Sequence, residues 1–212
     1  MGLEELFGRI EKRFGKEAVV GNDIKVDTVS SGSMAFDEIL GGGFALGRIH
    51  EIYGGNSCGK TSCALHLCAS IQKTLGKAVG YVDTEQALDL EYAKALGVDL
   101  SRDKWIMSQP DSAEQALEIV REMLEVPEIG LVVLDSVAGL VPEAVLQGEA
   151  GDAKIALVAR LMSQQLSILK NVCKKNGNIL LCINQTRQKI GGMGFGPTTV
   201  SYTHLTLPTI LL

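Results

Sequence analysis

GGNSCGKT, at residues 54–61, fits the pattern G-x-x-x-x-G-K-[ST] of a phosphate-binding loop. The run RIHEIYG at 48–54 leads directly into it and is β-rich, whereas CGKTSCALHLCASIQKTL at 58–75 has a helical pattern. A strand before the loop and a helix after it are the context that separates a true phosphate-binding loop from a glycine-rich turn that binds nothing. The stretch therefore predicts a nucleotide-binding α/β core.

The expected chemistry of the loop comes from its backbone and from two side chains. Successive backbone N–H groups and the N-terminus of the following helix attract phosphates. Lys60 is expected to contact the β- and γ-phosphates of ATP, and Thr61 to bind Mg²⁺. The residues of the loop that are predicted to bind nucleotide are Gly54, Gly55, Asn56, Ser57, Cys58, Gly59, Lys60 and Thr61.

Short apolar runs alternate with longer helical patterns along the rest of the chain. Continuous apolar strands separated by amphipathic helices indicate an α/β fold with a mostly parallel sheet, covered by helices on both faces. The expected strands lie at 48–54, 77–83, 103–109, 129–136 and 178–185. The expected helices lie at 58–75, through 92–97, at 112–125 and at 155–175.

A separate small unit precedes this core. The segment LEELFGRIEKRF at 3–14 carries apolar residues at helical spacing, and KVDTVSS at 25–31 has the alternation of a short strand. A single helix and strand bury too little apolar surface to be stable alone, so we expect this unit to dock on its own core or on a neighbouring molecule.

Composition limits the class of protein. The formal net charge of −5 disfavours a surface that binds nucleic acid everywhere, although a local basic strip could still bind phosphates. No apolar run approaches the roughly 20 residues of a membrane-spanning helix. The five cysteines show no C-x-x-C pair, so we expect buried, reduced thiols and a cytoplasmic protein. His50 and His66 are expected to be packing or capping residues, and no metal other than Mg²⁺ is indicated.

The final residues, VSYTHLTLPTILL at 200–212, break the pattern of the chain. The first ten of them, VSYTHLTLPT, look like a translated transposon-end sequencing adapter, and the alternative is a genuine terminal strand. We therefore expect three parts: a helix and strand at 1–32, a core at 33–199 that stops inside a loop, and a non-native tail at 200–212. A core without its later strands would leave an unpaired sheet edge.

Polar residues follow several of the predicted strands, at the edge where a parallel sheet places its ligands. Asp135 is expected to hold Mg²⁺ through water, with helix capping as the alternative. Glu85 or Asp83 could polarise the water that attacks the γ-phosphate, and the residues alone do not choose between them. Gln185 could sense the γ-phosphate or satisfy a loop backbone.

The segment TRQKIGGMGFGPTT at 186–199 follows this last strand. Arg187 and Lys189 could meet phosphates of a nucleic acid, and Met193 and Phe195 could wedge between bases on a glycine-rich tether. A solvated, disordered lid is the alternative interpretation.

Taken together, the motifs resemble those of the bacterial RecA recombinase family over residues 3 to about 199. The stretches that carry the resemblance are IEKRFGK (10–16), VDTVSSGSMAFDEILGGG (26–43), GRIHEIYGGNSCGKTS (47–62), YVDTEQALDLEYAKALGVD (81–99), SQPDSAEQALEI (108–119), VVLDSVAGLVP (132–142), GEAGD (148–152), ARLMSQQL (159–166) and INQTRQKIG (183–191).

The resemblance implies a RecA-like P-loop NTPase core whose N-terminal helix and strand dock on the adjacent subunit of a helical filament. It implies that Glu85 is the catalytic glutamate, that Asp135 is the Walker B aspartate, and that Gln185 couples the γ-phosphate to DNA binding. Asp89 and Tyr92 match residues that hold the adenine. The catalytic set is then Glu85, Lys60 and Gln185. The family has two DNA-binding loops. The first matches the segment at 147–154, which includes Gly148, with Arg160 just beyond it. The second begins at Gln185 and includes Arg187, Lys189, Met193 and Phe195.

The function implied is ATP-dependent homologous recombination and DNA repair. Such a protein forms filaments on single-stranded DNA, pairs it with double-stranded DNA, and supports self-cleavage of a LexA-type repressor. Two alternatives remain: a RadA-like or helicase-type ATPase of the same fold, and a non-catalytic, ATP-switched filament scaffold. We expect this truncated chain to be inactive by itself.

Overall fold

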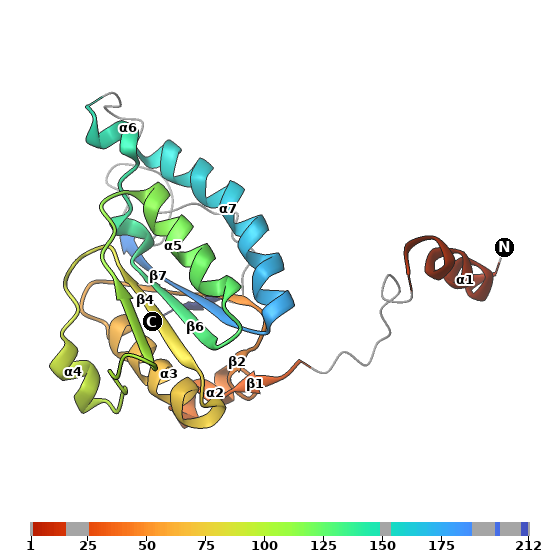
Figure 1. Cartoon of the computed structure of the whole chain (residues 1–212), viewed down its shortest axis with the longest axis horizontal. Helices are drawn as coiled ribbons and strands as arrows, with labels where there is room; N and C mark the ends of the chain where they lie inside the picture. Colours follow the sequence, from red (N-terminus) through yellow and green to blue (C-terminus); the bar gives the residue numbers. More distant parts are fainter. Residues whose placement is uncertain (1, 16–25, 149–153, 188–197, 200–208, 212) are drawn as a thin grey trace.

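The computed structural model describes residues 2–15, 26–148, 154–187, 198–199 and 209–211. A parallel sheet with strand order β5-β4-β6-β7-β3-β9 forms the centre of the molecule, and β8 pairs antiparallel with β7 at one end (Figure 1). The strands of this sheet are β3 (Ile49–Gly54), β4 (Ala78–Asp83), β5 (Trp105–Ser108), β6 (Ile129–Asp135), β7 (Ile179–Arg187), β8 (Thr198–Thr199) and β9 (Thr209–Leu211). The prediction of an α/β fold with a mostly parallel sheet is confirmed.

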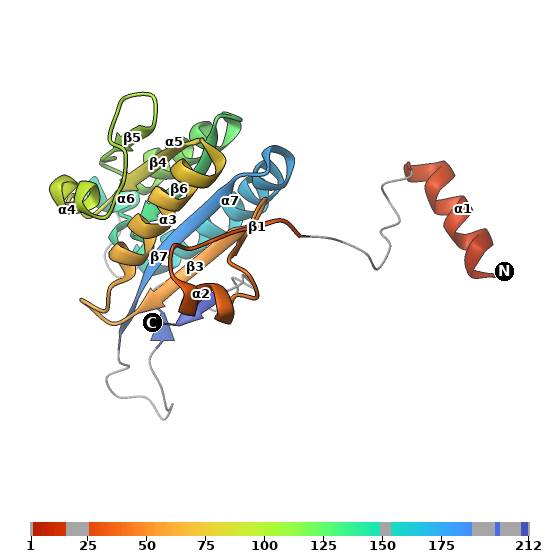
Figure 2. The same cartoon turned by 90° about the horizontal axis from the view of Figure 1, so that it is seen from below.

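Helices cover both faces of the sheet. α3 (Lys60–Leu75) packs on one face, and α5 (Ala113–Glu125) and α7 (Lys154–Asn176) pack side by side on the other (Figures 1 and 2). Every residue of β4 and β6 is buried, because these inner strands lie between the two helical layers. This is the reason that the strands appear in the sequence as continuous apolar runs.

Shorter elements complete the described core. They are β1 (Thr28–Val29), α2 (Met34–Ile39), β2 (Phe44–Ala45), α4 (Leu90–Ala95), the 3-10 turn η2 (Val137–Gly139) and α6 (Glu143–Leu146). Sequence analysis did not predict α2 or α6, because helices of 6 and 4 residues are too short to show a clear apolar period.

The N-terminal unit divides into two differently placed parts. α1 (Leu3–Phe14) has no buried residue and lies apart from the sheet in Figures 1 and 2. β1 is shorter than the strand expected at 25–31, and it pairs antiparallel with β2 of the same chain. The expected strand thus has a pairing partner inside the chain, and docking on a neighbour stays a prediction for the unit as a whole.

The tail also contributes an element. Thr209–Leu211 forms β9, which runs parallel to β3 at the edge of the sheet. The division of the chain at residues 32 and 199 remains a prediction. None of the helices in the described segments combines the length and the apolar character needed to cross a bilayer.

Candidate nucleotide-binding site

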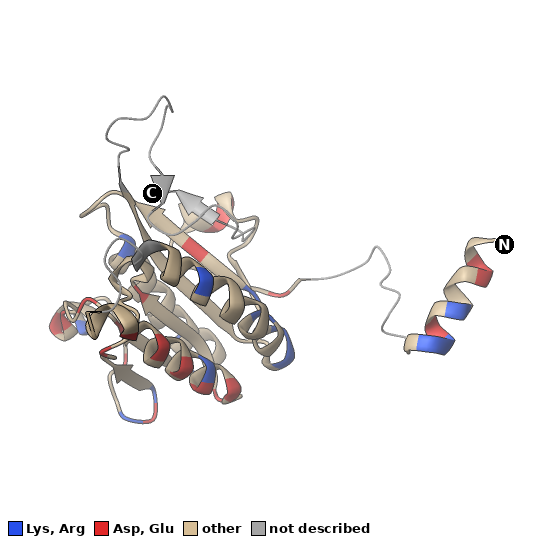
Figure 3. Cartoon of the chain, turned by 90° about the horizontal axis from the view of Figure 1, so that it is seen from above, with Lys and Arg blue, Asp and Glu red and all other residues tan. Residues whose placement is uncertain are grey.

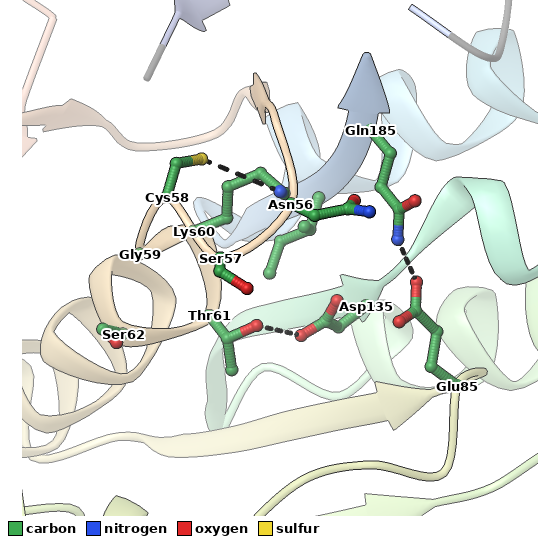
Figure 4. A pocket seen from close by; sticks show the side chains of 11 residues that line it. Asn56, Ser57, Cys58, Gly59, Lys60, Thr61, Ser62, Glu85, Asp135 and Gln185 are labelled. Atoms are coloured by element: carbon green, nitrogen blue, oxygen red, sulfur yellow. Dashed lines mark hydrogen bonds between the residues drawn. The ribbon is translucent and has the colours of Figure 1, made fainter. Parts of the chain in front are cut away.

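A cavity of about 490 Å³ lies where β3, β6 and β7 end and α3 begins. Because parallel strands end at the same edge of the sheet, residues that are far apart in sequence meet there. The lining residues are Asn56, Ser57, Cys58, Gly59, Lys60, Thr61, Ser62, Glu85, Asp135, Ile183 and Gln185 (Figure 4). The structure therefore brings most of the predicted nucleotide-binding residues together around one cavity.

The loop between β3 and α3 has the backbone of a phosphate-binding loop. Residues 55–59 are exposed, and residues 56–59 line the cavity. Gly59, which precedes the first residue of α3, has φ 92°, a left-handed conformation that L residues with a side chain rarely adopt. Ser57 also has positive φ, at 58°. The loop thus turns sharply and places the N-terminus of a 16-residue helix at the cavity.

Lys60 extends back over the loop from the first turn of α3. Its ammonium group donates to the carbonyl oxygens of Gly55 at 2.6 Å and Gly54 at 3.3 Å, and it lies 3.8 Å from the sulfur of Cys58. Only 8% of Lys60 is exposed. A positive charge is therefore held among the backbone groups at which phosphates are expected.

Thr61 and Asp135 form the oxygen pair that suits Mg²⁺. The Thr61 hydroxyl donates to Asp135 Oδ2 at 2.9 Å, across the cavity from α3 to the end of β6 (Figure 4). Burial raises the pKa of Asp135 above its ordinary value, and hydrogen bonds from Tyr81 and Thr61 act in the opposite direction. A hydroxyl and a carboxylate fit a hard cation that keeps several waters, as Mg²⁺ does. These residues would hold the ion, with waters and phosphates supplying the other oxygens.

Glu85 and Gln185 meet on the other side of the cavity. Gln185 Nε2 donates to Glu85 Oε1 at 2.7 Å, although 100 positions separate them in the sequence (Figure 4). The Ser136 hydroxyl donates to the same carboxylate oxygen. One carboxylate thus joins the ends of β4, β6 and β7.

Asp83, the alternative to Glu85, has a different environment. It is 2% exposed, does not line the cavity, and accepts hydrogen bonds from the Leu88 backbone N–H at 3.1 Å and from Gln109 Nε2 at 3.3 Å. Asp83 has the contacts of a structural carboxylate, whereas Glu85 faces the cavity.

Thr84 fixes the backbone that follows Asp135. Its hydroxyl donates to the Ser136 carbonyl oxygen at 2.7 Å and accepts from the Ser136 N–H at 3.0 Å. The neighbouring strand therefore holds the turn from which the Ser136 hydroxyl reaches Glu85.

Asp89 and Tyr92, the predicted adenine contacts, lie at the start of α4 and do not line the cavity. Asp89 caps this helix by accepting from the N–H groups of Glu91 and Tyr92 at 2.9 and 3.1 Å. The Tyr92 hydroxyl lies 3.0 Å from Ser62 Oγ, on α3 beside the loop. Tyr92, which is 44% exposed, therefore contacts a residue that lines the cavity.

The predicted DNA-binding residues are described only in part. Gly148 follows α6 and has φ 78°, and Arg160 is exposed on α7. Arg187 is the last residue of β7, two residues after Gln185. Lys189, Met193 and Phe195 lie outside the described residues.

The cysteines follow the expectation except at one position. All five are free, and Cys63, Cys68, Cys173 and Cys182 are buried. Burial raises the pKa of the Cys63 thiol to about 11. Cys58 is instead exposed, because the loop that carries it faces the cavity, and its thiol donates to the Gly55 carbonyl oxygen at 3.0 Å.

Three groups around the site were not predicted. The Tyr81 hydroxyl donates to Asp135 Oδ2 at 2.7 Å, Thr84 holds Ser136, and Ser62 meets Tyr92. The strand alternation offered a signal for Tyr81, because two positions separate it from Asp83 and place both on one face of β4. Its partner depends on which strand lies beside β4, and the sequence pattern does not give that order.

Known proteins are similar to this chain over most of its length. The family described as the RecA N-terminal domain matches residues 2–205. The chain belongs to the RecA family. Members of this family bind ATP and act in recombination and repair. The resemblance seen in the sequence motifs is therefore confirmed.

Individual relatives have similar degrees of identity to the chain. It is 48% identical over 200 residues to a protein named Protein RecA from Latilactobacillus sakei, covering 92% of this chain and 56% of that protein. The identity is 47% over 203 residues to Protein RecA of Arthrospira platensis, covering 94% of this chain and 55% of that protein. It is 47% over 204 residues to Protein RecA of Clostridium botulinum, covering 94% and 56%. The chain thus spans about half the length of these relatives.

Proposed function

We propose that this chain is the ATP-binding part of a DNA-dependent recombinase in which nucleotide binding and DNA binding are coupled. The observation that carries the proposal is the hydrogen bond from Gln185 to Glu85. It joins the strand that leads toward the predicted DNA-binding segment to the carboxylate that faces the nucleotide cavity.

Each side chain of the cavity has a role in this proposal. Lys60 neutralises the β- and γ-phosphates, and the loop N–H groups bind their oxygens. Thr61 and Asp135 would hold Mg²⁺, which would supply positive charge close to the phosphates. Glu85 accepts a proton from a water molecule as the water oxygen bonds to the γ-phosphorus. The bond from that phosphorus to the β–γ bridging oxygen breaks, and ADP and phosphate are the products.

Gln185 provides a route from nucleotide to DNA. Its neutral amide carries two N–H donors, and the nitrogen that now bonds to Glu85 can turn toward a γ-phosphate instead. A change of partner would move the end of β7, and Arg187 with it. The proposed DNA contacts form two groups. One is Arg187, Lys189, Met193 and Phe195, and the other is the region of Gly148 and Arg160.

The proposed partners follow from the family. They are single-stranded and double-stranded DNA, further copies of the same protein in a helical filament, and a LexA-type repressor, in a cytoplasmic setting. The exposed apolar side chains of α1 support the proposal of a filament, because such side chains need a surface on which to pack.

The test measures nucleotide affinity and turnover of the chain, with and without single-stranded DNA. A fluorescent ATP analogue reports binding, and phosphate release reports hydrolysis. We expect Glu85→Gln to bind nucleotide and to reduce any turnover by about 100-fold or more. We expect Gln185→Ala to bind nucleotide with an affinity that no longer responds to DNA. Absence of nucleotide binding by the wild-type chain overturns the proposal.

The same variants separate the alternatives. A scaffold that only switches with ATP would assemble on DNA and release it equally in the wild type and in the Glu85→Gln variant, whereas in a recombinase the loss of hydrolysis would slow the release of DNA. A helicase-type ATPase would unwind duplex DNA, which a recombinase core is not expected to do.

A further inference from the structure

Tyr81 is a fully buried residue of β4 whose hydroxyl meets the predicted Mg²⁺ site from beneath. None of the residue is exposed, and it does not line the nucleotide cavity. Its hydroxyl donates to Asp135 Oδ2 at 2.7 Å. A buried phenol needs a partner for its O–H group, and here that partner is the carboxylate proposed to hold the ion.

The sheet places the two residues on one face. Tyr81 pairs with Val133 in the parallel register of β4 and β6, so Asp135, two residues beyond Val133, points to the same side. That side is covered by α3, and Thr61 is the second residue of this helix. Three elements therefore converge on the Asp135 carboxylate.

The tyrosine ring is held firmly behind the carboxylate. It stacks on Trp105 of β5 with ring centroids 5.4 Å apart and an interplanar angle of 29°. A phenol is protonated at neutral pH, so the hydroxyl donates and the carboxylate accepts. The position of the ring therefore fixes the direction of this hydrogen bond.

Asp135 Oδ2 accepts two hydrogen bonds, and the two donors differ in what else they do. Thr61 also belongs to the proposed ion site, and its oxygen is expected to contact Mg²⁺. Tyr81 does not reach the cavity, so its bond does not depend on the bound nucleotide or ion. Both bonds use the same oxygen, and Figure 4 shows the other carboxylate oxygen of Asp135 directed away from Thr61.

We propose that Tyr81 is a positioning residue for Mg²⁺: its hydroxyl holds Oδ2 of Asp135 and so keeps the second carboxylate oxygen available for the waters around the ion. This inference rests on the proposed function, because it assumes that the cavity binds nucleotide with Mg²⁺. Residues that hold a metal ligand in place commonly change metal affinity by 10–100-fold when they are replaced. Tyr81 would therefore set how strongly Mg²⁺ supports nucleotide binding.

The test compares nucleotide affinity in EDTA with affinity in excess Mg²⁺. The ratio of the two dissociation constants measures the coupling between ion and nucleotide in the site. We expect Tyr81→Phe to reduce this ratio about tenfold while changing the dissociation constant in EDTA less than twofold. A purely structural role would weaken binding in both buffers, so the ratio distinguishes the two.

Matched variants complete the experiment. Tyr53→Phe removes a hydroxyl from half-buried Tyr53 on β3, outside the cavity, and should leave the ratio unchanged. Tyr81→Met lacks the hydroxyl in a different side chain, and it should match Tyr81→Phe. Thermal unfolding identifies which of the two Tyr81 variants is folded for the comparison.

The outcomes separate this inference from the proposed function. If the wild type binds nucleotide more tightly in Mg²⁺ and a folded Tyr81 variant has the same ratio, the role of Tyr81 is refuted and the nucleotide site stands. If the wild type binds no nucleotide, or binds it equally with and without Mg²⁺, the proposed site and this inference both fail.

Discussion

The cavity at the end of the sheet and helix α1 at the start of the chain represent opposite situations. In the cavity, Thr61, Glu85 and Gln185 each have a hydrogen-bond partner from a distant part of the same chain. In α1, the apolar side chains Leu3 and Phe14 are 72% and 66% exposed. The side chains of the cavity are held by contacts within the chain, whereas no residue of α1 is buried in the described structure.

The difference lies in what each region needs from the rest of the molecule. Strands that run parallel end at one edge, so a single chain can assemble a polar site from several of them. α1 is amphipathic, with acidic residues in its first turn and basic residues in its last, and both signs are visible along it in Figure 3. An apolar stripe of this kind indicates that a helix packs against something but does not specify the surface.

The largest expected effect is on nucleotide binding. Lys60→Ala removes the charge that lies over the loop, and we expect it to weaken binding of a fluorescent ATP analogue by about 100-fold, because phosphate contacts to a charged donor are strong. Lys73→Ala removes an exposed charge from the last turn of the same helix and serves as the control. Phe7→Ala, in α1, should also bind the ATP analogue with the affinity of the wild type. Equal loss in the Phe7 variant would show that α1 contributes to the cavity.

The second test compares the two regions by stability. Leu124 is a fully buried residue of α5, and Leu124→Ala should reduce the free energy of unfolding by about 2–5 kcal/mol. Phe7 is 44% exposed, and Phe7→Ala should change it by less than about 0.5 kcal/mol in dilute solution. Urea unfolding measures both.

Measuring unfolding at several protein concentrations tests whether α1 packs on a second copy of the chain. If α1 packs on a second copy of the chain, Phe7→Ala should become destabilising as the protein concentration rises. A concentration-independent loss from Phe7→Ala as large as that from Leu124→Ala would mean that α1 packs on its own core.

Much of the fold was predictable, because buried parallel strands and the helices between them give distinct apolar patterns. β6 and α5 were predicted close to their observed limits. The phosphate-binding loop was predictable because its chemistry is local. The residues alone did not choose between Glu85 and Asp83, because the two are only two positions apart at a strand end. The family resemblance implied Glu85, and of the two only Glu85 lines the cavity, so its catalytic role stays a prediction. The role of Tyr81 depends on β4 lying beside β6, which no local pattern encodes.

A third, smaller effect is expected at a buried polar contact behind the cavity. Asn184 Nδ2 donates to Glu51 Oε1 at 2.8 Å, and Asn184 Oδ1 accepts from the Gln185 N–H at 2.9 Å. Burial raises the pKa of Glu51, and the bond from Asn184 opposes that shift. Asn184→Ala removes both contacts and should reduce the free energy of unfolding by about 1–3 kcal/mol.

The same variant tests how the sheet supports the site. Because Asn184 holds the backbone of Gln185, Asn184→Ala should also weaken the effect of DNA on nucleotide affinity. Asn171→Ala, an exposed position on α7, is the control. If Asn184→Ala lowers the free energy of unfolding but leaves the effect of DNA on nucleotide affinity unchanged, Asn184 stabilises β7 without positioning Gln185.

The smallest expected effect is a pH dependence of stability that originates in the sheet. His50 on β3 is 2% exposed, its Nε2 lies 2.9 Å from the Ala45 carbonyl oxygen, and its ring packs edge-on against Phe44. Burial lowers the pKa of His50, opposed by the bond to Ala45, so the folded chain favours the neutral ring. As the pH falls from 7.5 to 5.5, the unfolded chain takes up this proton more readily than the folded chain, and the free energy of unfolding must decrease.

Substitution separates this histidine from other titrating groups. Glu51 has a raised pKa, so its contribution to the free energy of unfolding changes with pH in the opposite direction. That contribution is present at low pH and is lost as the pH rises through the pKa of Glu51 in the folded chain. His50→Val should therefore flatten the decrease in stability between pH 7.5 and 5.5, measured by urea unfolding at each pH. His66→Gln, at an exposed position on α3, should leave the decrease intact. An unchanged slope in His50→Val would assign the pH dependence to titrating groups other than His50.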